Sequence, residues 1–564
     1  MPASASRWLP LALVALLALW LRTHDLAARP LHADEANQAV KTGELLESGR
    51  YAFDPRDHHG PTLYYAALPI AWLRGQRTLA ALDETTVRLV PALAGTLAVV
   101  LLGLLAAPLG RFPSLAAAAF LALSPPAVYY ARYFVQETLL LAFTLGACLC
   151  VQRWWSGRRV RWALAAGVAV GLMQATKASA PLFLFAAALA CAIALRRPRR
   201  AIALVAPDPA SAVQPAPRPA ARLARHFALG IAMAVFVAAL FYSSFGTHPA
   251  GLRDAIATYF QAAQRLEGAT GHEKPWSYYA CLLTWWPAGG LVFQQLAFVA
   301  TALAGLALAL LPSRALRFSA ARSSSQPSTS TPPPASASIS PAPVSSSPIH
   351  ASPTEPSSSR PRHLQSTPPS AQRHLINDTL PLLFRWAAVY TVLVAAALSL
   401  TPYKTPWHVI HLVPGLALLA AGALAAIPRR GIGVLLAAAI LAQLAAQTRL
   451  AVFQRPADPR NPYAYVHSSP DVLKFRPLAD AALARSPGGV IRVIGEEYWP
   501  LPWYFRGVSR VGYWSTPPDD CDGALVIASS TQAGAVRARL HGAYRESLLG
   551  LRPGFLCVVF TPAP

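Results

Sequence analysis

Two adjacent acids directly follow the first long apolar run of the chain. They are Asp34 and Glu35, in the segment 31–36, which reads LHADEA. Ionisable side chains beside a hydrophobic run are costly unless they are solvated or take part in chemistry, and a positioned carboxylate is a common general base. Both acids would also suit a helix N-terminus, where the dipole favours negative charge. We predict a catalytic role for the pair and keep the helix-dipole explanation as its alternative.

Two histidines and an aromatic stretch continue the same region. His58 and His59 precede Gly60 and Pro61, and Tyr64 lies in the aromatic stretch that follows. Aromatic side chains of this kind settle at the membrane interface. Paired histidines can bind metal, but their spacing does not resemble a closed zinc site. Contact with phosphate or sugar is therefore the favoured role, and a divalent cation stays open.

Three cations and a third acid lie in comparable positions further along. Arg132 and Glu137 lie between two apolar runs, Lys177 interrupts an apolar stretch, and Lys404 lies in the segment 401–407. An arginine and a glutamate so placed can form a plain ion pair, and a single lysine near the end of a span commonly snorkels to the interface. Together with the acid pair, these residues indicate an anionic substrate at the membrane surface.

These side chains have the chemistry needed for glycosyl transfer from a polyprenyl-phosphate sugar. An acid removes the proton of the acceptor nucleophile. Cations stabilise the departing phosphate as its charge grows. The alternative is a flippase, or a flippase-associated protein, for lipid-linked sugars. That alternative predicts charges deep within the spans, whereas the apolar runs here are mostly free of charge.

Composition identifies the elements that must position these residues as membrane helices. Of the 564 residues, 54% are hydrophobic and 13% are charged, against about 25% charged in an ordinary soluble chain. Apolar runs near 20 residues match the thickness of a bilayer core. The net charge is +24, and the charged residues lie between the apolar runs. This placement argues against nucleic acid as a partner. We predict a mainly α, polytopic membrane protein of about 11 spans.

The basic clusters predict which side of the membrane each loop occupies. With the N-terminus in the cytoplasm, the arginines at 153–161, 196–200 and 429–430 all fall inside, as cytoplasmic loops favour. Residues 1–317 then form a transmembrane region whose first outer loop is 22–84, and residues 376–447 form the C-terminal spans. The acids and cations described above all fall on the non-cytoplasmic face.

Two segments are predicted to lie outside the membrane region. Residues 318–375 are rich in Ser, Pro and Ala, a composition that cannot bury enough apolar surface to order the chain, so we predict a disordered cytoplasmic linker. Residues 448–564 are predicted to form a small extracytoplasmic α/β domain. Its helix is expected at 471–485 and its strands at 489–495, 524–529 and 555–560.

The predicted outer domain contains two cysteines and several aromatic residues. An oxidising compartment would permit a disulfide between Cys521 and Cys557, and whether they pair stays open. Trp503, in the segment 499–504, either stacks on an acceptor sugar or belongs to the domain core.

The chain resembles the GT-C superfamily of membrane glycosyltransferases, near the protein O-mannosyltransferase and aminoarabinose transferase branch. Within that group it is most similar to a family described as flippase-activity-associated proteins. The resemblance covers about residues 8–510 without the linker. The matching segments are residues 32–39 (HADEANQA), 57–65 (DHHGPTLYY), Arg132 with Glu137, Thr176-Lys177, 272–276 (HEKPW), 403–407 (YKTPW) leading into Pro414, and 499–504 (WPLPWY).

The resemblance implies roles for individual residues. Asp34 matches the catalytic base with Glu35 assisting, and Glu137 matches a second acid near the donor. Lys177 and Lys404 match positions beside the lipid phosphate. The transferase branch usually has a lysine before the two prolines of the first loop, where this chain has His59. Either His59 replaces that lysine as a hydrogen-bond donor to the phosphate, or the phosphate is held differently.

The expected reaction is inverting hexosyl or pentosyl transfer at the outer face of a bacterial inner membrane. The donor is a polyprenyl-phosphate sugar, held by His59, Arg132, Lys177 and Lys404, and the acceptor is a glycan, lipid or protein. No cofactor is expected, apart from the open question of a divalent cation. The expected acceptor contacts are His58, Tyr64, His272, Lys274, Trp276 and Trp503.

Overall fold

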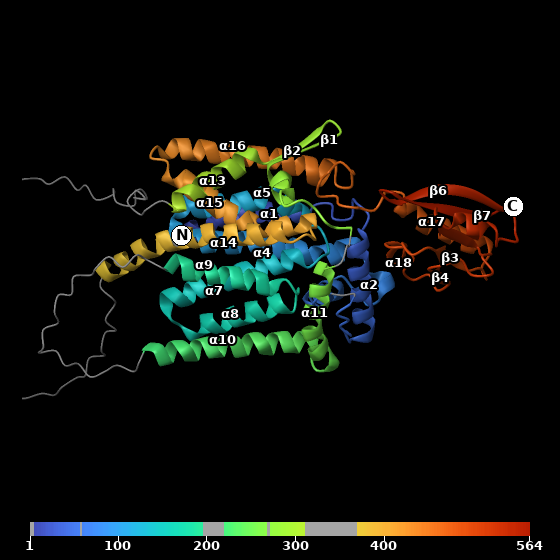
Figure 1. Cartoon of the computed structure of the whole chain (residues 1–564), viewed down its shortest axis with the longest axis horizontal. Helices are drawn as coiled ribbons and strands as arrows, with labels where there is room; N and C mark the ends of the chain where they lie inside the picture. Colours follow the sequence, from blue (N-terminus) through green and yellow to red (C-terminus); the bar gives the residue numbers. More distant parts are fainter. Residues whose placement is uncertain (1–4, 57–58, 196–218, 268–270, 311–368, 564) are drawn as a thin grey trace, which may run out of the picture.

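The protein is a bundle of long helices with a small sheet domain at one end (Figure 1). The computed structural model describes residues 5–56, 59–195, 219–267, 271–310 and 369–563. The helices at the predicted spans are α1 (Ala5–Thr23), α4 (Glu84–Ala106), α5 (Arg111–Leu123), α7 (Glu137–Gly157), α8 (Val160–Gln174), α9 (Ala180–Leu195), α10 (Pro219–Tyr242), α13 (Leu296–Leu310), α14 (Pro369–Leu400), α15 (Val413–Ala426) and α16 (Arg430–Thr448).

Apolar composition explains why this part of the chain is helical. Inside a bilayer every backbone polar group must find its partner within the segment, which favours helices. Six helical segments among the described residues are long and apolar enough to cross a membrane, and the other five helices just named are shorter but apolar. The prediction of a polytopic helical membrane protein is confirmed, while the number of spans stays a prediction.

Short elements occupy one end of the bundle. In Figure 1, α2 (Ala33–Ser48) and α11 (Ala250–Glu267) run across the end that faces the sheet domain. The other short elements at this end are α3 (Thr62–Leu73), α6 (Pro125–Tyr130), α12 (Tyr278–Thr284), and the short helices η1 (Leu79–Ala81), η3 (Pro406–His411) and η4 (Arg449–Gln454), whereas η2 (Ala107–Leu109) follows the far end of α4. The turns α7–α8 and α15–α16, which contain predicted cytoplasmic arginines, lie at the opposite end (Figure 1).

One apolar run is helical over only part of its length. The run at 287–311 is long enough for a single membrane helix, but its first part forms a hairpin of β1 (Trp285–Ala288) and β2 (Leu291–Gln294). Gly289 and Gly290 form the turn with φ of 50° and 83°, a backbone region that glycine enters without steric cost. The span helix α13 therefore starts only at Leu296.

The C-terminal segment forms the expected α/β domain. Its elements are α17 (Val472–Arg485), β3 (Ile491–Ile494), α18 (Leu501–Tyr504), β4 (Val511–Trp514), β5 (Leu525–Ser529), α19 (Ala533–Arg537), β6 (Tyr544–Arg552) and β7 (Phe555–Pro562). The sheet order is β4-β3-β5-β7-β6, with β3 parallel to β4 and β5, and β7 antiparallel to β5 and β6. The three predicted strands correspond to β3, β5 and β7.

The two cysteines of this domain do not form a disulfide. Cys521 and Cys557 are both free and buried, and they belong to different hydrophobic clusters of the domain. Cys521 and Cys557, whose pairing the sequence left open, are therefore not joined in this structure.

The sheet domain and the first outer loop share one hydrophobic core. Leu31 and Ala36 at the start of α2 belong to the same buried cluster as Phe475 of α17 and Trp503 of α18. The start of α2, where Asp34 and Glu35 lie, is therefore held between the bundle and the C-terminal domain. The predicted linker 318–375 lies outside the described residues except at its end, where α14 begins.

Candidate active site

A capping box places the two adjacent acids in the first turn of α2. His32 is the N-cap residue, and its Nδ1 accepts the backbone N–H of Asp34 at 3.0 Å. The carboxylate of Glu35 accepts the backbone N–H of His32 at 3.1 Å, which completes the reciprocal arrangement. The side chain of Asp34 is 49% exposed, whereas that of Glu35 is completely buried.

The buried carboxylate of Glu35 is surrounded by hydrogen-bond donors. Arg88 of α4 donates to both of its oxygens at 2.8 and 2.7 Å, and the backbone N–H of Phe134 donates at 2.9 Å. Burial by itself would raise the pKa of Glu35, but the charges of Arg88 and Arg29 and these hydrogen bonds outweigh burial and lower it from 4.5 to about 2. Glu35 is therefore ionised and fully occupied by its partners.

The Arg88 guanidinium also holds the chain that leads into α2. Besides Glu35, it donates to the backbone carbonyl oxygens of Leu26, Arg29 and Pro30 at 2.8, 3.0 and 3.0 Å. A fully buried arginine needs all its donors satisfied. Arg88 was not singled out in the sequence, because nothing near position 88 marks it as the partner of Glu35, which lies 53 residues earlier.

A second polar cluster lies where α7, α8 and η3 meet. The ammonium of Lys177, just after α8, donates to the Glu137 carboxylate at the start of α7. His408 of η3 brings its Nε2 within 3.4 Å of the Lys177 Nζ and 3.8 Å of the Glu137 Oε1. Its Nδ1 lies 3.4 Å from the hydroxyl of Tyr279. Sequence analysis found Glu137 and Lys177 and missed His408, although it directly follows the segment 401–407.

The first outer loop docks on this second cluster through its backbone. Gly60 donates its N–H to the carbonyl of Thr176 at 3.1 Å, and Thr62 donates its N–H to Ala175 at 3.2 Å. A Cβ on Gly60 would lie only 2.2 Å from the Ala175 carbonyl oxygen, so this contact needs glycine. The docking brings His59 close enough to His408 for their charges to interact. His58 lies outside the described residues.

Lys404 is tied to the backbone of a neighbouring loop. The residue is buried, and its Nζ donates to the carbonyl oxygens of Lys274 at 3.1 Å and of Thr401. The backbone N–H of Lys404 also donates to the His272 carbonyl at 3.0 Å. The structure therefore joins the 272–276 loop to Lys404 and does not place Lys404 against Lys177 by any recorded contact among the described residues.

The 272–276 loop gathers around Tyr465, which follows the last span. His272 Nδ1 lies 2.9 Å from the Tyr465 hydroxyl, and the Lys274 Nζ lies 5.6 Å from the centre of its ring. Trp276 is 73% exposed. Tyr465 is also close enough to Asp34 for that carboxylate to help raise its pKa, after the larger effect of burial. Tyr465 was missed because its neighbours come from three distant segments.

The two clusters are neighbours across one indole ring. Trp407 precedes His408 of the second cluster, and its ring centre lies 6.1 Å from that of His32, the N-cap beside Asp34. The same indole lies 6.3 Å from the ring of Tyr465. Asp34, the 272–276 loop and the Glu137–Lys177–His408 cluster are thus parts of one region at the end of the bundle.

Three of the predicted contact residues have other surroundings. Arg132 donates to the carbonyl oxygens that end α1, those of residues 21, 22, 24 and 25. Tyr64 is buried and donates its hydroxyl to Gln38. Trp503 is fully buried and donates its indole N–H to Glu84 at 2.7 Å. A buried ring has no free face for a sugar, so the structure favours the core alternative for Trp503.

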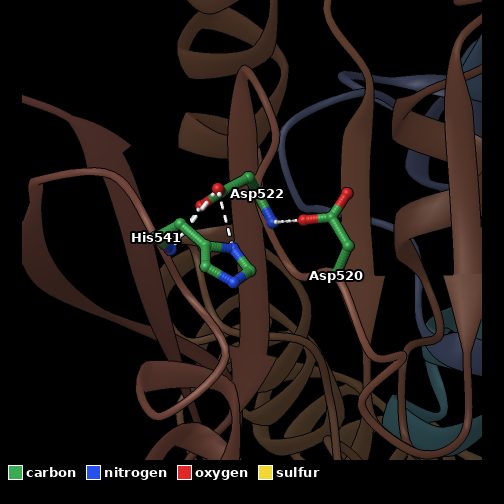
Figure 2. Close-up of side chains that lie close together, drawn as sticks. All are labelled: Asp520, Asp522 and His541. Atoms are coloured by element: carbon green, nitrogen blue, oxygen red, sulfur yellow. Dashed lines mark hydrogen bonds and ion pairs between the residues drawn. The ribbon is translucent and has the colours of Figure 1, made fainter.

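A group with the spacing of metal ligands lies in the C-terminal domain, apart from the acids of α2. Ligand atoms of Asp520, Asp522 and His541 lie within 4.8 Å of one another (Figure 2). Asp522 accepts the backbone N–H of His541 at 3.1 Å, and Asp520 accepts from Arg492 at 3.0 Å. These hydrogen bonds account for the arrangement. Within the described residues, no comparable group includes Asp34 or Glu137.

Comparisons with known proteins agree with the architecture. Residues 68–207 match the profile of a family described as dolichyl-phosphate-mannose-protein mannosyltransferase. No curated protein sequence matches the chain. Two solved structures of ArnT from Cupriavidus metallidurans are similar in fold. The apo form is 13% identical over 99% of this chain and 98% of that one, with a TM-score of 0.61. The form bound to undecaprenyl phosphate is 15% identical over the same shares, with a TM-score of 0.57.

The fold predicted from the resemblance is confirmed, while the flippase-associated subtype stays a prediction. At these identities the similarity to ArnT concerns the fold, which extends over nearly the whole of both chains. The chain is therefore a multi-pass membrane protein with the fold of the GT-C superfamily of membrane glycosyltransferases.

Proposed function

We propose that the protein transfers a sugar from a polyprenyl-phosphate donor to an acceptor at the outer face of a bacterial inner membrane. The observation that carries this proposal is the pairing of a half-exposed carboxylate, Asp34, with the buried Glu137–Lys177–His408 cluster across Trp407. The similar fold of ArnT, which has been solved with undecaprenyl phosphate bound, supports the choice of donor.

Asp34 is the group that takes the proton of the acceptor. Its carboxylate is accessible, and His32 and the first turn of α2 fix its backbone. In the proposed step the acceptor oxygen attacks the anomeric carbon of the sugar, and its proton passes to Asp34. The bond from that carbon to the phosphate oxygen breaks, and its electron pair leaves with the lipid phosphate. Attack opposite the leaving group inverts the anomeric centre.

The lipid phosphate is assigned to the cations of the second cluster. Lys177 supplies an ammonium group where α8 ends and α7 begins, the His408 Nε2 lies 3.4 Å from it, and His59 lies close to His408. Such preorganised donors stabilise the negative charge that grows on the leaving phosphate. In this arrangement His59 occupies the position where the transferase branch usually has lysine. Lys404 acts through the 272–276 loop that it holds.

Glu35 is a positioning residue in this proposal. Its oxygens are engaged by Arg88, Phe134 and the backbone of His32, so it does not reach a substrate. By closing the capping box it fixes the helix turn that presents Asp34. The acceptor would approach from the side of His272, Lys274 and Trp276, which surround Tyr465.

A transfer assay on the purified full-length protein in nanodiscs tests the proposal. Polyprenyl-phosphate sugars serve as donors, extracts of the cell envelope serve as acceptors, and labelled product is measured. We expect Asp34→Asn to lower transfer by about a thousandfold, within the range for general-base removal. The matched control is Glu44→Gln, because Glu44 lies on the same helix and its side chain is 53% exposed.

Two results would contradict the proposal. Transfer that survives Asp34→Asn would remove Asp34 from the chemistry. Movement of the lipid-linked sugar across the bilayer without any transfer would favour the flippase alternative. Adding a chelator to the same assay decides whether a divalent cation is required.

A further inference from the structure

A small cavity lies at the outer end of α1, apart from the site just described. It has a volume of about 30 Å³, and its lining includes Asp25, Ala28, Arg29, Tyr129, Arg132 and Phe453. It is formed where the end of α1, the α6–α7 turn and η4 meet. These are the ends of membrane helices, so the cavity is at the level where lipid headgroups meet the protein.

Two buried guanidinium groups line the cavity. Arg29 and Arg132 are each 7% exposed. The Arg29 side chain donates to the carbonyl oxygen of Arg132, and it also interacts with the Tyr129 hydroxyl and with the Glu35 carboxylate at 3.9 Å. Its guanidinium lies over the rings of Tyr129 and Tyr133, 4.8 and 4.4 Å from their centres. Arg29 and Arg132 thus bring two planar, fork-shaped donor groups to one cavity, and this is the geometry by which arginine holds phosphate.

The surrounding charge is unbalanced. Four arginines are buried here, and the described ion pairs join the Glu35 carboxylate to Arg88 and Arg29 only. Arg22 and Arg132 donate to backbone carbonyl oxygens instead. Buried charges are normally compensated by an opposite charge. Burial, followed by the charges of Arg29 and Arg88, lowers the pKa of Arg132 from 12.5 to about 9, and the nearby Asp25 offsets only part of this.

The cavity is distinct from the region around Asp34. The ring of Tyr133 lies between them, with the Arg29 guanidinium 4.4 Å from its centre and the His32 ring 5.5 Å from it. On the far side, the guanidinium of Arg132 lies 5.1 Å from the ring of Phe453. A ligand held here would therefore touch neither Asp34 nor Lys177.

We infer that this cavity binds a phosphate group, carried by the headgroup of an anionic phospholipid or free in solution, as a second anion site separate from the sugar donor. The phosphate oxygens would enter between Arg29 and Arg132 and supply negative charge beside Arg132, whose side chain donates to backbone carbonyl oxygens of the described residues. At this depth a lipid headgroup can place its phosphate in the cavity while its acyl chains remain in the bilayer.

Thermal unfolding of the full-length protein in a neutral detergent tests this inference. Inorganic phosphate, a short-chain phosphatidylglycerol and a short-chain phosphatidylcholine are titrated separately at constant ionic strength. A ligand that binds only the folded state stabilises it by RT ln(1 + [L]/Kd), so the unfolding temperature rises with the logarithm of ligand concentration above the Kd. We expect this logarithmic stabilisation by phosphatidylglycerol, by inorganic phosphate, or by both, and weaker stabilisation by the zwitterionic lipid.

Three variants locate the effect. Ala28 is exposed at the cavity mouth, so Ala28→Glu should weaken binding at least tenfold by repulsion. Asp25→Asn removes the acid at the mouth and should tighten binding about threefold; asparagine tolerates the positive φ of 52° at this position. Ala27→Glu is the matched control, because Ala27 is exposed but does not line the cavity. It should change binding by less than twofold.

The outcomes separate the sources and decide the inference. A response to phosphatidylglycerol alone identifies a lipid headgroup, a response to inorganic phosphate alone identifies a free ion, and a response to both shows that the phosphate group itself is recognised. No response to either ligand overturns the inference. So does an equal loss in Ala28→Glu and Ala27→Glu, which would reduce the effect to nonspecific surface charge.

Discussion

The two polar regions at the end of the bundle differ in how their acids are used. At the start of α2, the two acids differ in burial: Glu35 is buried against Arg88, whereas Asp34 is half exposed. In the second region the acid and the cation are paired with each other, because Lys177 donates to Glu137 and both are nearly excluded from solvent. One region presents a free base to water, and the other holds a preformed buried ion pair.

This difference indicates which region reacts and which one binds. A half-exposed carboxylate can exchange protons with an acceptor that arrives from solvent. A buried cation with one acidic partner is already positioned, so that an incoming phosphate can share it without reorganisation. The comparison leads to four predictions, ordered from the largest expected effect to the smallest.

Substitution of the two neighbouring acids of α2 should destabilise the protein to very different extents. Glu35→Gln leaves Arg88 buried without its counter-charge, and breaking a buried ion pair costs roughly 3–5 kcal/mol. Asp34→Asn changes a half-exposed group and should cost less than about 0.5 kcal/mol. Unfolding temperatures of the two variants in detergent, compared with the unchanged protein, measure the contrast. Similar losses in both variants would remove the distinction between a positioning acid and a reacting acid.

The pH dependence of stability should report the same buried carboxylate. The pKa of Glu35 in the folded protein is about 2, below its ordinary 4.5, so its contribution is complete above pH 4.5 and is lost as the pH falls toward 2. The shift corresponds to roughly 3 kcal/mol. Unfolding temperatures of the unchanged protein should fall faster between pH 5 and 3 than those of Glu35→Gln. Parallel curves would contradict the assignment.

Changes in the second region should act on donor binding. Lys177→Met removes the cation and should lower kcat/KM for the donor about a hundredfold, while Lys177→Arg retains part of the activity. Glu137→Gln releases Lys177 from its partner and should strengthen inhibition by free polyprenyl phosphate. Initial rates at varied donor concentration test both variants. Weaker inhibition in Glu137→Gln would show that Glu137 does not compete for Lys177.

The smallest effect is expected where the sheet domain meets the first loop. Trp503→Phe keeps a buried ring but loses the hydrogen bond to Glu84, which should cost about 1 kcal/mol. The KM for the acceptor should not change. An acceptor KM that rises severalfold with unchanged stability would restore Trp503 as a sugar contact.

The sequence alone determined the membrane character, the helical spans and the list of candidate residues. Each of these follows from local patterns, because a bilayer requires long apolar helices and selects positive charge on one side. The strands β4 and β6 were missed for a local reason as well. β4 contains a glycine and β6 begins with Tyr544-Arg545-Glu546, so neither reads as a β-branched apolar run.

Only the tertiary structure decided which partner each candidate has. Arg88 donates to the carboxylate of Glu35, and Lys177 donates to that of Glu137. Arg132 donates to carbonyl oxygens at the end of α1, beside a separate cavity. The physical reason is that a charged side chain excluded from water takes whichever partner the packed fold brings within hydrogen-bond reach, and those partners lie far away along the chain. Sequence patterns were enough to predict the candidate reactive groups. Packing determined that Asp34 is exposed while its neighbour Glu35 is buried.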